Sequence, residues 1–176
     1  ASALLAEFAP EFPAGYARLG KCYLKAGNYE KAETALHKAL ELYENDKKTA
    51  NNLSYIFNKT KRYEKTVEVL EKFAHEDAKD LITLMNLGIA FFHVGQKDMA
   101  FDLFNSAYKL NPNMPEVHLY IGHCLKEFGQ TEKANLAYRR YKVLTESKTA
   151  PQQQQPRDDA PQPTSKSASD EEIDLN

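Results

Sequence analysis

Residues 81–114 carry the sequence LITLMNLGIAFFHVGQKDMAFDLFNSAYKLNPNM, and this stretch decides the fold. Apolar residues recur in it at spacings of three and four, in one run around Leu87 and a second run around Phe104. That spacing places the apolar residues on one face of an α-helix, so the stretch predicts two amphipathic helices. Gly95 lies between the runs and suits a turn, because glycine adopts the left-handed backbone conformation at little cost. The stretch therefore predicts a helical hairpin.

The hairpin pattern recurs along the chain with a period of 34 residues, and the glycines show this most clearly. Six of the seven glycines fall on two phases of that period, seven residues apart. The first phase holds Gly20, Ser54, Gly88 and Gly122, and the second holds Gly27, Gly95 and Gly129. We expect the first phase to let facing helices approach closely and the second to form turns. A fixed period of this length indicates a solenoid of stacked units.

The recurring residues resemble the tetratricopeptide repeat, a family with a pattern of 34 positions. Residues 81–114 match that pattern best, with these residues at nine of its positions: Leu84, Leu87, Gly88, Phe91, Gly95, Ala100, Phe104, Ala107 and Pro112. The related pentatricopeptide RNA readers have a period of 35, whereas this period stays at 34 without slippage. The resemblance covers about residues 1–147 and implies an all-α fold, an α-α superhelix of about four helix-turn-helix repeats.

The same period divides the chain into units. Residues 1–12 align with the end of a preceding repeat helix, repeats 1 to 4 occupy residues 13–46, 47–80, 81–114 and 115–148, and residues 149–176 form a Pro/Gln-rich acidic tail. Repeat 4 is also expected to be the C-terminal cap, because a phase that reads Leu40 and Tyr108 earlier becomes Lys142 there. We expect the tail to be disordered, since it has too little apolar surface to offset the entropy of ordering.

Composition argues against several classes of function. Lys and Arg number 23 and Asp and Glu 25, so the formal net charge is −2 and no basic field exists to hold nucleic acid. No apolar run approaches the length needed to insert into a membrane. The chain has no glycine-rich phosphate loop, no catalytic triad order and no metal-ligand spacing, which predicts a protein that is not an enzyme and uses no cofactor or metal.

Three residues that can carry chemistry are expected to be structural. Cys22 and Cys124 share a phase three repeats apart, too far for a disulfide, and we expect both to be small core residues. Unpaired cysteines suit a reducing compartment, so the predicted location is the cytoplasm. His118 occupies a phase that is aromatic in the family, which favours a core residue over a metal ligand.

The resemblance also implies a binding surface, because in the family the first helix of each repeat lines a concave groove. Carrying the family's contact phases over to this chain gives these candidates: Arg18, Lys21, Lys48, Asn51, Asn52, Tyr55 and Lys59 in the first two repeats, and Ile82, Met85, Asn86, Ile89, Phe92, His93, Tyr120 and His123 in the last two. The first set is basic and polar and the second is apolar and aromatic. A partner segment that is acidic with an apolar anchor suits this division.

An apolar stripe strengthens that interpretation. Ile82, Met85, Ile89 and Phe92 follow spacings of three, four and three, on a phase that the packed core does not need. Apolar side chains exposed in a row are typical of a binding site. The alternative is that these four side chains serve only to pack the superhelix and bind no partner.

Two asparagines occupy a second family phase. Asn52 and Asn86 stand where superhelical members hold a peptide backbone, and a side-chain amide can donate and accept hydrogen bonds at once. The dicarboxylate clamp of co-chaperones is absent, because Asn51 and Tyr55 stand where that clamp has lysine and asparagine.

The predicted function is a protein–protein interaction scaffold or adaptor that binds an extended or helical partner segment in the groove. Two alternatives remain: a targeting or regulatory array with a catalytic domain upstream, and a self-assembling oligomer. The tail carries a net charge of −4 against +2 for the rest of the chain, so it either docks in the groove or serves only as a solubilising tail.

Overall fold

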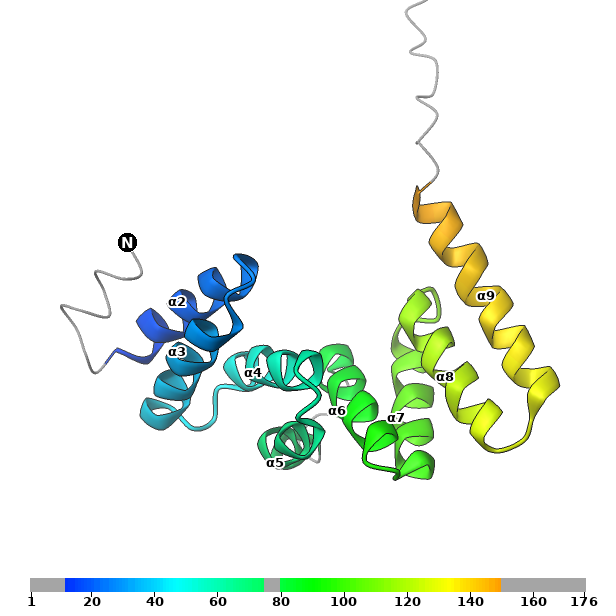
Figure 1. Ribbon diagram of the computed structural model, residues 1–176, viewed down its shortest axis with the longest axis horizontal. Coiled ribbons are helices and arrows are strands. Elements are labelled where there is room, and N and C mark those ends of the chain that lie inside the picture. The colour runs from blue at the N-terminus through cyan, green and yellow to red at the C-terminus, as the bar shows by residue number, and fades with distance from the viewer. Residues whose placement is uncertain (1–11, 75–79, 150–176) are drawn as a thin grey trace, which may run out of the picture.

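The structure is a computed structural model that describes residues 12–74 and 80–149 (Figure 1). These residues form eight α-helices and no strand: α2 Pro13–Lys25, α3 Tyr29–Leu42, α4 Lys47–Lys59, α5 Tyr63–Ala74, α6 Leu81–His93, α7 Lys97–Leu110, α8 Pro115–Glu127 and α9 Thr131–Thr149. Consecutive helices pair as hairpins, and the hairpins follow one another from α2 to α9 in an elongated array (Figure 1). The predicted all-α superhelix is confirmed.

The turns inside the hairpins use the second glycine phase, as the sequence predicts. Gly27, Gly95 and Gly129 have φ angles of +75°, +90° and +74°, in the left-handed region that favours glycine. In the second hairpin the same phase holds Lys61, whose φ is +59°. A lysine held in this conformation is strained, because its Cβ crowds the backbone. The second hairpin therefore closes with the same turn at a higher cost.

Close approach of facing helices explains the first glycine phase. A Cβ added at Gly88 would lie 2.7 Å from Cε1 of Phe104, and one added at Gly122 would lie 2.5 Å from Cε1 of Tyr138. Ser54 stands at this phase in α4, and among the described residues its hydroxyl is the buried side-chain polar atom without a hydrogen-bond partner. The phase is thus a contact point between the two helices of each hairpin.

The core is a continuous row of apolar contacts along the array. One cluster gathers around Leu36, Leu53 and Phe57 at the N-terminal end, and a larger one contains Phe104 and many residues of α6 and α8. Leu40 and Val69 pack against both clusters and so join them. Each fully buried large side chain contributes about 1.5–3 kcal/mol to folding. Each hairpin therefore depends on its neighbours for much of its stability.

Cys22 departs from its prediction, whereas Cys124 and His118 follow theirs. Cys22 is exposed, but Cys124 is buried, and burial raises the pKa of the Cys124 thiol to about 11. Ile56, one period after Cys22, is fully buried because the first hairpin packs on it, and no described helix precedes α2 to do the same for Cys22. His118 is buried with its Nε2 2.7 Å from the carbonyl oxygen of Pro112.

Parts of the predicted domain division fall where the structure gives no description. Residues 1–11, expected to end a preceding helix, and residues 150–176, expected to be a disordered tail, lie outside the described residues. The division into repeats at 13–46, 47–80, 81–114 and 115–148 stays a proposal. None of the described helices combines the length and the apolar character that crossing a membrane requires.

Candidate functional site

A cleft of about 470 Å³ crosses the first helices of the second, third and fourth hairpins. In space, α4 contacts α6 and α6 contacts α8, so the side chains of the three helices can line one continuous surface. The cleft is lined by Tyr55, Asn58, Lys59, Tyr63, Ile82, Met85, Asn86, Ile89, His93, Met114, Glu116 and Tyr120. Five of these twelve residues come from α6, the middle helix, more than from any other helix.

Helix α6 presents its cleft residues at spacings of three and four, on one face of the helix. Ile82, in the first turn, is 61% exposed, and Ile89 is half-buried two turns later. Met85 lies between them but is buried within the core cluster, with an exposed fraction of 5%. The predicted apolar stripe is therefore not separate from the core: Met85 belongs to both, while Ile82 gives the cleft its most open apolar side chain.

A hydrogen-bonded amide network joins α4 to α6 beside the cleft. The Asn51 amide donates to Oγ1 of Thr83 at 2.9 Å and to Oδ2 of Asp80 at 3.2 Å. The Asn86 amide donates to the backbone oxygen of Asn51 at 3.3 Å. Burial opposes ionisation of Asp80, but hydrogen bonds from Thr83, the Ile82 backbone and Asn51 outweigh it and lower the pKa of that carboxyl. Both asparagines thus use their amide donors to hold neighbouring helices together.

Four lining residues are absent from the candidates named above: Asn58, Tyr63, Met114 and Glu116. Asn58, near the end of α4, donates to the backbone oxygen of Asn86 at 2.9 Å and accepts from the hydroxyl of Thr66 at 2.9 Å. Tyr63 begins a second helix, α5, and Met114 precedes α8, so neither stands at a first-helix contact phase. Tyr63 directly follows a turn and Met114 directly precedes a helix, and these positions were the signal in the sequence that could have identified them.

Aromatic rings cluster at the His93 end of the cleft. The Tyr63 and His93 rings stack with centroids 4.2 Å apart, and Phe92 meets His93 edge-on at 5.4 Å. The Phe92 ring lies 6.0 Å from His123, whose Nδ1 is 3.3 Å from the hydroxyl of Tyr138. Loss of water contact lowers the pKa of His93 and of His123, and each is also near a cationic side chain or the other histidine. Both imidazoles are thereby biased toward the neutral form.

The charged side chains lie at the two sides of the cleft. Lys59, on α4, has its Nζ 5.4 Å from the centre of the Tyr55 ring, while Glu116 stands on α8. Burial raises the pKa of Tyr120, which stacks on Phe104 at 5.0 Å. The cleft therefore presents a cationic side, an apolar and aromatic middle, and an anionic side.

The structure brings about half of the predicted candidates into this one cleft. Those that line it are Tyr55, Lys59, Ile82, Met85, Asn86, Ile89, His93 and Tyr120. Phe92 and His123 are half-buried next to it, Asn51 is buried behind it, Asn52 is half-buried elsewhere on α4, and Arg18, Lys21 and Lys48 are exposed outside its lining. Within the described ranges 12–74 and 80–149, no three His, Cys, Asp or Glu side chains are arranged to hold a metal ion.

Comparisons with known proteins point to one repeat family. Residues 13–46 match the tetratricopeptide repeat family. The chain is similar to BBSome complex member BBS4 of Bos taurus, with 26% identity over 126 residues, which is 72% of this chain and 24% of that protein. The chain thus spans about a quarter of the length of this curated relative.

Solved structures of MamA have a similar fold. One, MamA from residue 41 to its end from Desulfovibrio magneticus RS-1, has a TM-score of 0.73 and 21% identity, covering 82% of each chain. MamA AMB-1 has a TM-score of 0.66 and 26% identity, covering 76% of this chain and 78% of the other. These similarities support a helical solenoid for this chain.

Proposed function

We propose that the chain, whose residues 13–46 match the tetratricopeptide repeat family, is an interaction scaffold or adaptor that binds a segment of another protein in the cleft across α4, α6 and α8. The observation that carries the proposal is Ile82, a large apolar side chain exposed beside aromatic rings in a concave surface. Exposed apolar side chains at a hollow are typical of protein-binding sites.

The lining of the cleft favours a partner segment with an apolar anchor. Ile82 and Ile89 offer an apolar contact, and Tyr55 and Tyr120 offer rings with polar tips, a combination enriched at protein interfaces. Lys59 adds a cation on one side. An acidic residue in the partner, placed next to its apolar anchor, would pair with that lysine. We propose an extended or helical segment as the ligand.

Contacts within the fold refine which predicted residues take part. The amides of Asn51 and Asn86 already donate to Thr83, Asp80 and the α4 backbone, so binding through them would require those bonds to break. We therefore assign recognition chiefly to Tyr55, Lys59, Ile82, Ile89 and Tyr120. The edge of this surface is formed by Phe92, His93 and His123. A longer partner segment would also contact Arg18, Lys21, Lys48 and Asn52.

A role inside a larger assembly is consistent with the comparison. The relative from Bos taurus is named as a member of a complex, and the chain corresponds to about a quarter of it. We propose by analogy a non-catalytic role, with the array joining components of an assembly. The cytoplasm is the proposed location, since Cys22 and Cys124 are both free.

The proposal is tested by substituting one exposed apolar residue inside the cleft and one outside it. Ile82→Asp places a charge in the cleft, and Leu136→Asp is the matched control, because the two side chains are 61% and 62% exposed and Leu136 lies on α9, away from the cleft. Each chain is used as bait for proteins from a native extract, with helix content checked by circular dichroism.

We expect a partner that the unsubstituted chain retains to be lost with Ile82→Asp and kept with Leu136→Asp. If both variants keep the partner, recognition does not use the cleft. A partner that both variants lose would also count against the cleft. Light scattering of the unsubstituted chain tests the alternative of self-assembly, which would appear as a mass that rises with concentration.

A further inference from the structure

The first helices of the first two hairpins, α2 and α4, carry positive charge and no aspartate or glutamate. Their six cationic residues are Arg18, Lys21 and Lys25 on α2 and Lys47, Lys48 and Lys59 on α4. The second helices of the same hairpins, α3 and α5, are mixed in charge, since each has three glutamates and two lysines. Charge in this half of the chain is therefore segregated between first and second helices.

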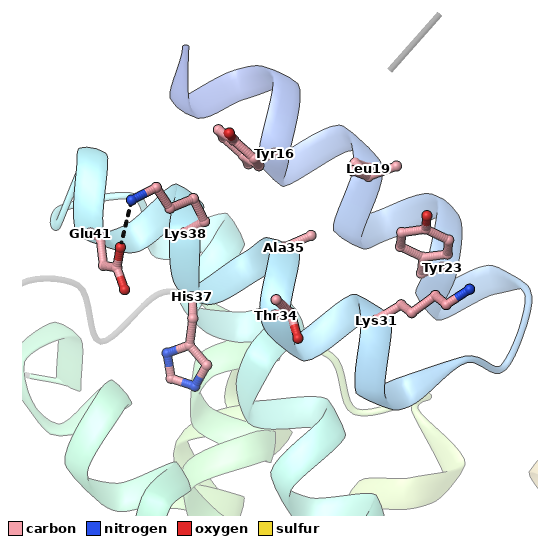
Figure 2. Close-up of a pocket in the computed structure, with 9 residues that line it drawn as sticks. All are labelled: Tyr16, Leu19, Tyr23, Lys31, Thr34, Ala35, His37, Lys38 and Glu41. Carbon is pink, nitrogen blue, oxygen red and sulfur yellow. Dashed lines mark hydrogen bonds and ion pairs between the residues drawn. The ribbon is translucent and has the colours of Figure 1, made fainter. Parts of the chain in front are cut away.

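The three cations of α2 lie on the side of that helix that faces away from α3. Figure 2 shows Tyr16, Leu19 and Tyr23 along α2, lining the cleft that this helix forms with α3. Each cation follows one of these residues by two positions, which is a rotation of about 200° around an α-helix. All three cations are exposed. The packing of α2 on α3 thus directs the cations away from the interior of the hairpin.

The cations stand at positions of the repeat that line the cleft across α4, α6 and α8. Lys21 lies two periods of 34 residues before Ile89, which lines that cleft. Lys48 lies one period before Ile82, and Lys59 lines the cleft itself. Helix α2 contacts α4, and α4 contacts α6. The positive charge therefore continues the cleft toward the N-terminal hairpin.

Four of these cations are exposed and have no carboxylate partner in residues 12–74 and 80–149. They form what we call the cationic surface: Arg18, Lys21, Lys25 and Lys48. Lysines on second helices can be paired, since Nζ of Lys38 lies 3.0 Å from Oε2 of Glu41 and Nζ of Lys72 lies 3.4 Å from Oε1 of Glu44. Like charges without a counter-charge repel one another, so a bound anion would lower the free energy of the cationic surface.

We propose that the cationic surface binds a run of acidic side chains in the partner segment whose apolar anchor occupies the cleft across α4, α6 and α8. This inference rests on the proposed function, because it takes one segment to continue from the cleft onto α2 and α4. Complementary charge is the argument for this occupant, and such charge gives specificity and fast association. Recognition uses side-chain carboxylates along the segment and needs no carboxylate at its end.

Other anionic occupants fit the molecule less well. The whole chain has a formal net charge of −2, so a long nucleic acid would be repelled outside α2 and α4. A flat anionic membrane cannot follow a surface that continues into a cleft. A second copy of the chain would present the glutamates of α5 together with the exposed Lys65 and Lys72, which the cationic surface would repel.

Fluorescence anisotropy tests the proposal with the full chain and a labelled oligoglutamate peptide, amidated so that it has no terminal carboxylate. The surface variant reverses three charges of the cationic surface: Arg18→Glu, Lys21→Glu and Lys48→Glu. The matched control reverses three exposed cations on α7 and α9: Lys109→Glu, Lys133→Glu and Arg139→Glu. The control changes the net charge equally, and its helices pack elsewhere, α7 on α6 and α8 and α9 on α8. Circular dichroism checks the helix content of each variant.

We expect the peptide to bind the unsubstituted chain and the control within about twofold of each other, and the surface variant about tenfold or more weakly. Binding to the unsubstituted chain should weaken as salt is added, because salt screens exposed charges. Glutamine in place of glutamate at the same three positions should cause a smaller loss, and it replaces the surface variant if charge reversal lowers helix content.

Several results would overturn the proposal. No binding to the unsubstituted chain at low salt, or an equal loss in the surface variant and the control, would reject the cationic surface as the site. Tighter binding of an RNA oligonucleotide or of phosphatidylserine vesicles, lost in the surface variant, would assign the surface to another class of anion. Self-association that the surface variant abolishes would assign it to a second copy.

Failure of this proposal and failure of the cleft are distinguishable. The oligoglutamate peptide has no apolar anchor, so its binding reports on the cationic surface alone. The substitution Ile82→Asp tests the cleft with a partner protein. A partner that is lost with Ile82→Asp but kept by the surface variant would leave the cleft as a site and reject the acidic run.

Discussion

At the residue scale, the left-handed turn at Lys61 is the clearest local strain in the described chain. Its φ of +59° occurs where the other three hairpins have glycine, and the backbone bond from the Arg62 N–H to the Phe57 oxygen, 2.8 Å, holds the turn in place. The structure thus keeps the common turn despite a residue that disfavours it.

Replacing this lysine by glycine should stabilise the fold. Relief of left-handed strain is worth about 1–2 kcal/mol and the added freedom of the unfolded chain offsets about half of it, so Lys61→Gly should raise the free energy of unfolding by about 0.5–1 kcal/mol. Urea denaturation measures the change. Lys61→Ala is the matched control, because it removes the side chain but keeps the strain. An equal gain from Lys61→Ala would show that the turn is not the cause.

The two histidines near the cleft should make stability depend on pH. Desolvation lowers the pKa of His93 and of His123, so the unfolded chain takes up protons more readily than the folded one. Their contribution is present above the unfolded pKa of about 6.5 and is lost as the pH falls toward the folded values. Thermal unfolding should therefore occur at lower temperature as the pH decreases from about 8 to 5.5.

The double variant His93→Gln and His123→Gln isolates this effect. It should flatten the decrease of unfolding temperature across that window. The carboxyls with lowered pKa, Glu33, Asp80 and Glu127, lose their contribution only at more acidic pH, so they do not confuse the result. An unchanged slope in the double variant would mean that other groups titrate in this range.

At the element scale, a two-point ion pair links the first hairpin to the second. The Arg62 guanidinium donates to both carboxylate oxygens of Glu33, with Nη1 to Oε1 at 2.8 Å and Nη2 to Oε2 at 2.5 Å. The hydrogen bond from Arg62 lowers the pKa of Glu33 even though partial burial opposes it. The same guanidinium lies 4.8 Å from the Phe57 ring, so it joins α3 to the turn between α4 and α5 in two ways.

A double-mutant cycle with Glu33→Gln and Arg62→Met should measure this link. We expect a coupling energy of about 0.5–1 kcal/mol, because both groups are partly exposed and solvent screens the pair. Lys38 and Glu41 form the comparison pair, since they lie within α3 at 3.0 Å and are exposed, and their coupling should be smaller because solvent screens it more strongly. A coupling at Arg62 no larger than that would show that the pair does not brace the hairpins.

At the scale of the whole molecule, we expect the free energy of unfolding to differ between hairpins, with central hairpins more stable than terminal ones. Each hairpin packs mainly on its neighbours, as in other solenoids, so the loss of a central unit should affect more of the chain than the loss of a terminal one. The glycines at the close contacts offer matched substitutions.

Gly88→Val and Gly122→Val should unfold different lengths of the chain. Each adds a side chain into a ring, of Phe104 in the centre and of Tyr138 at the end. Hydrogen exchange should show loss of protection in α8 and α9 alone for Gly122→Val. For Gly88→Val it should also extend from α6 and α7 into the neighbouring hairpins. Equal loss along the whole chain in both variants would indicate a single cooperative unit.

The sequence by itself determined the helical hairpins and their period. It could do so because the hairpins pack in the same way with similar residue types: a small residue at the close contact, as at Gly88, and a left-handed residue at the turn, as at Gly95. Repetition makes these local requirements visible without any knowledge of distant contacts. The phase rule failed at Cys22, where the neighbour that buries this position elsewhere has no described counterpart.

Only the tertiary structure decided which candidates share a cleft and which are occupied within the fold. Asn52 and Asn86 share one phase of the repeat pattern, yet Asn52 is half-buried outside the cleft lining, whereas Asn86 lines the cleft and its amide donates to the α4 backbone. Tyr63 lines the cleft from a second helix, whereas the family's contact phases lie on the first helix of each repeat. The reason is that contacts between repeats pair different residues in each unit, so they follow from the packing of neighbours and not from the period.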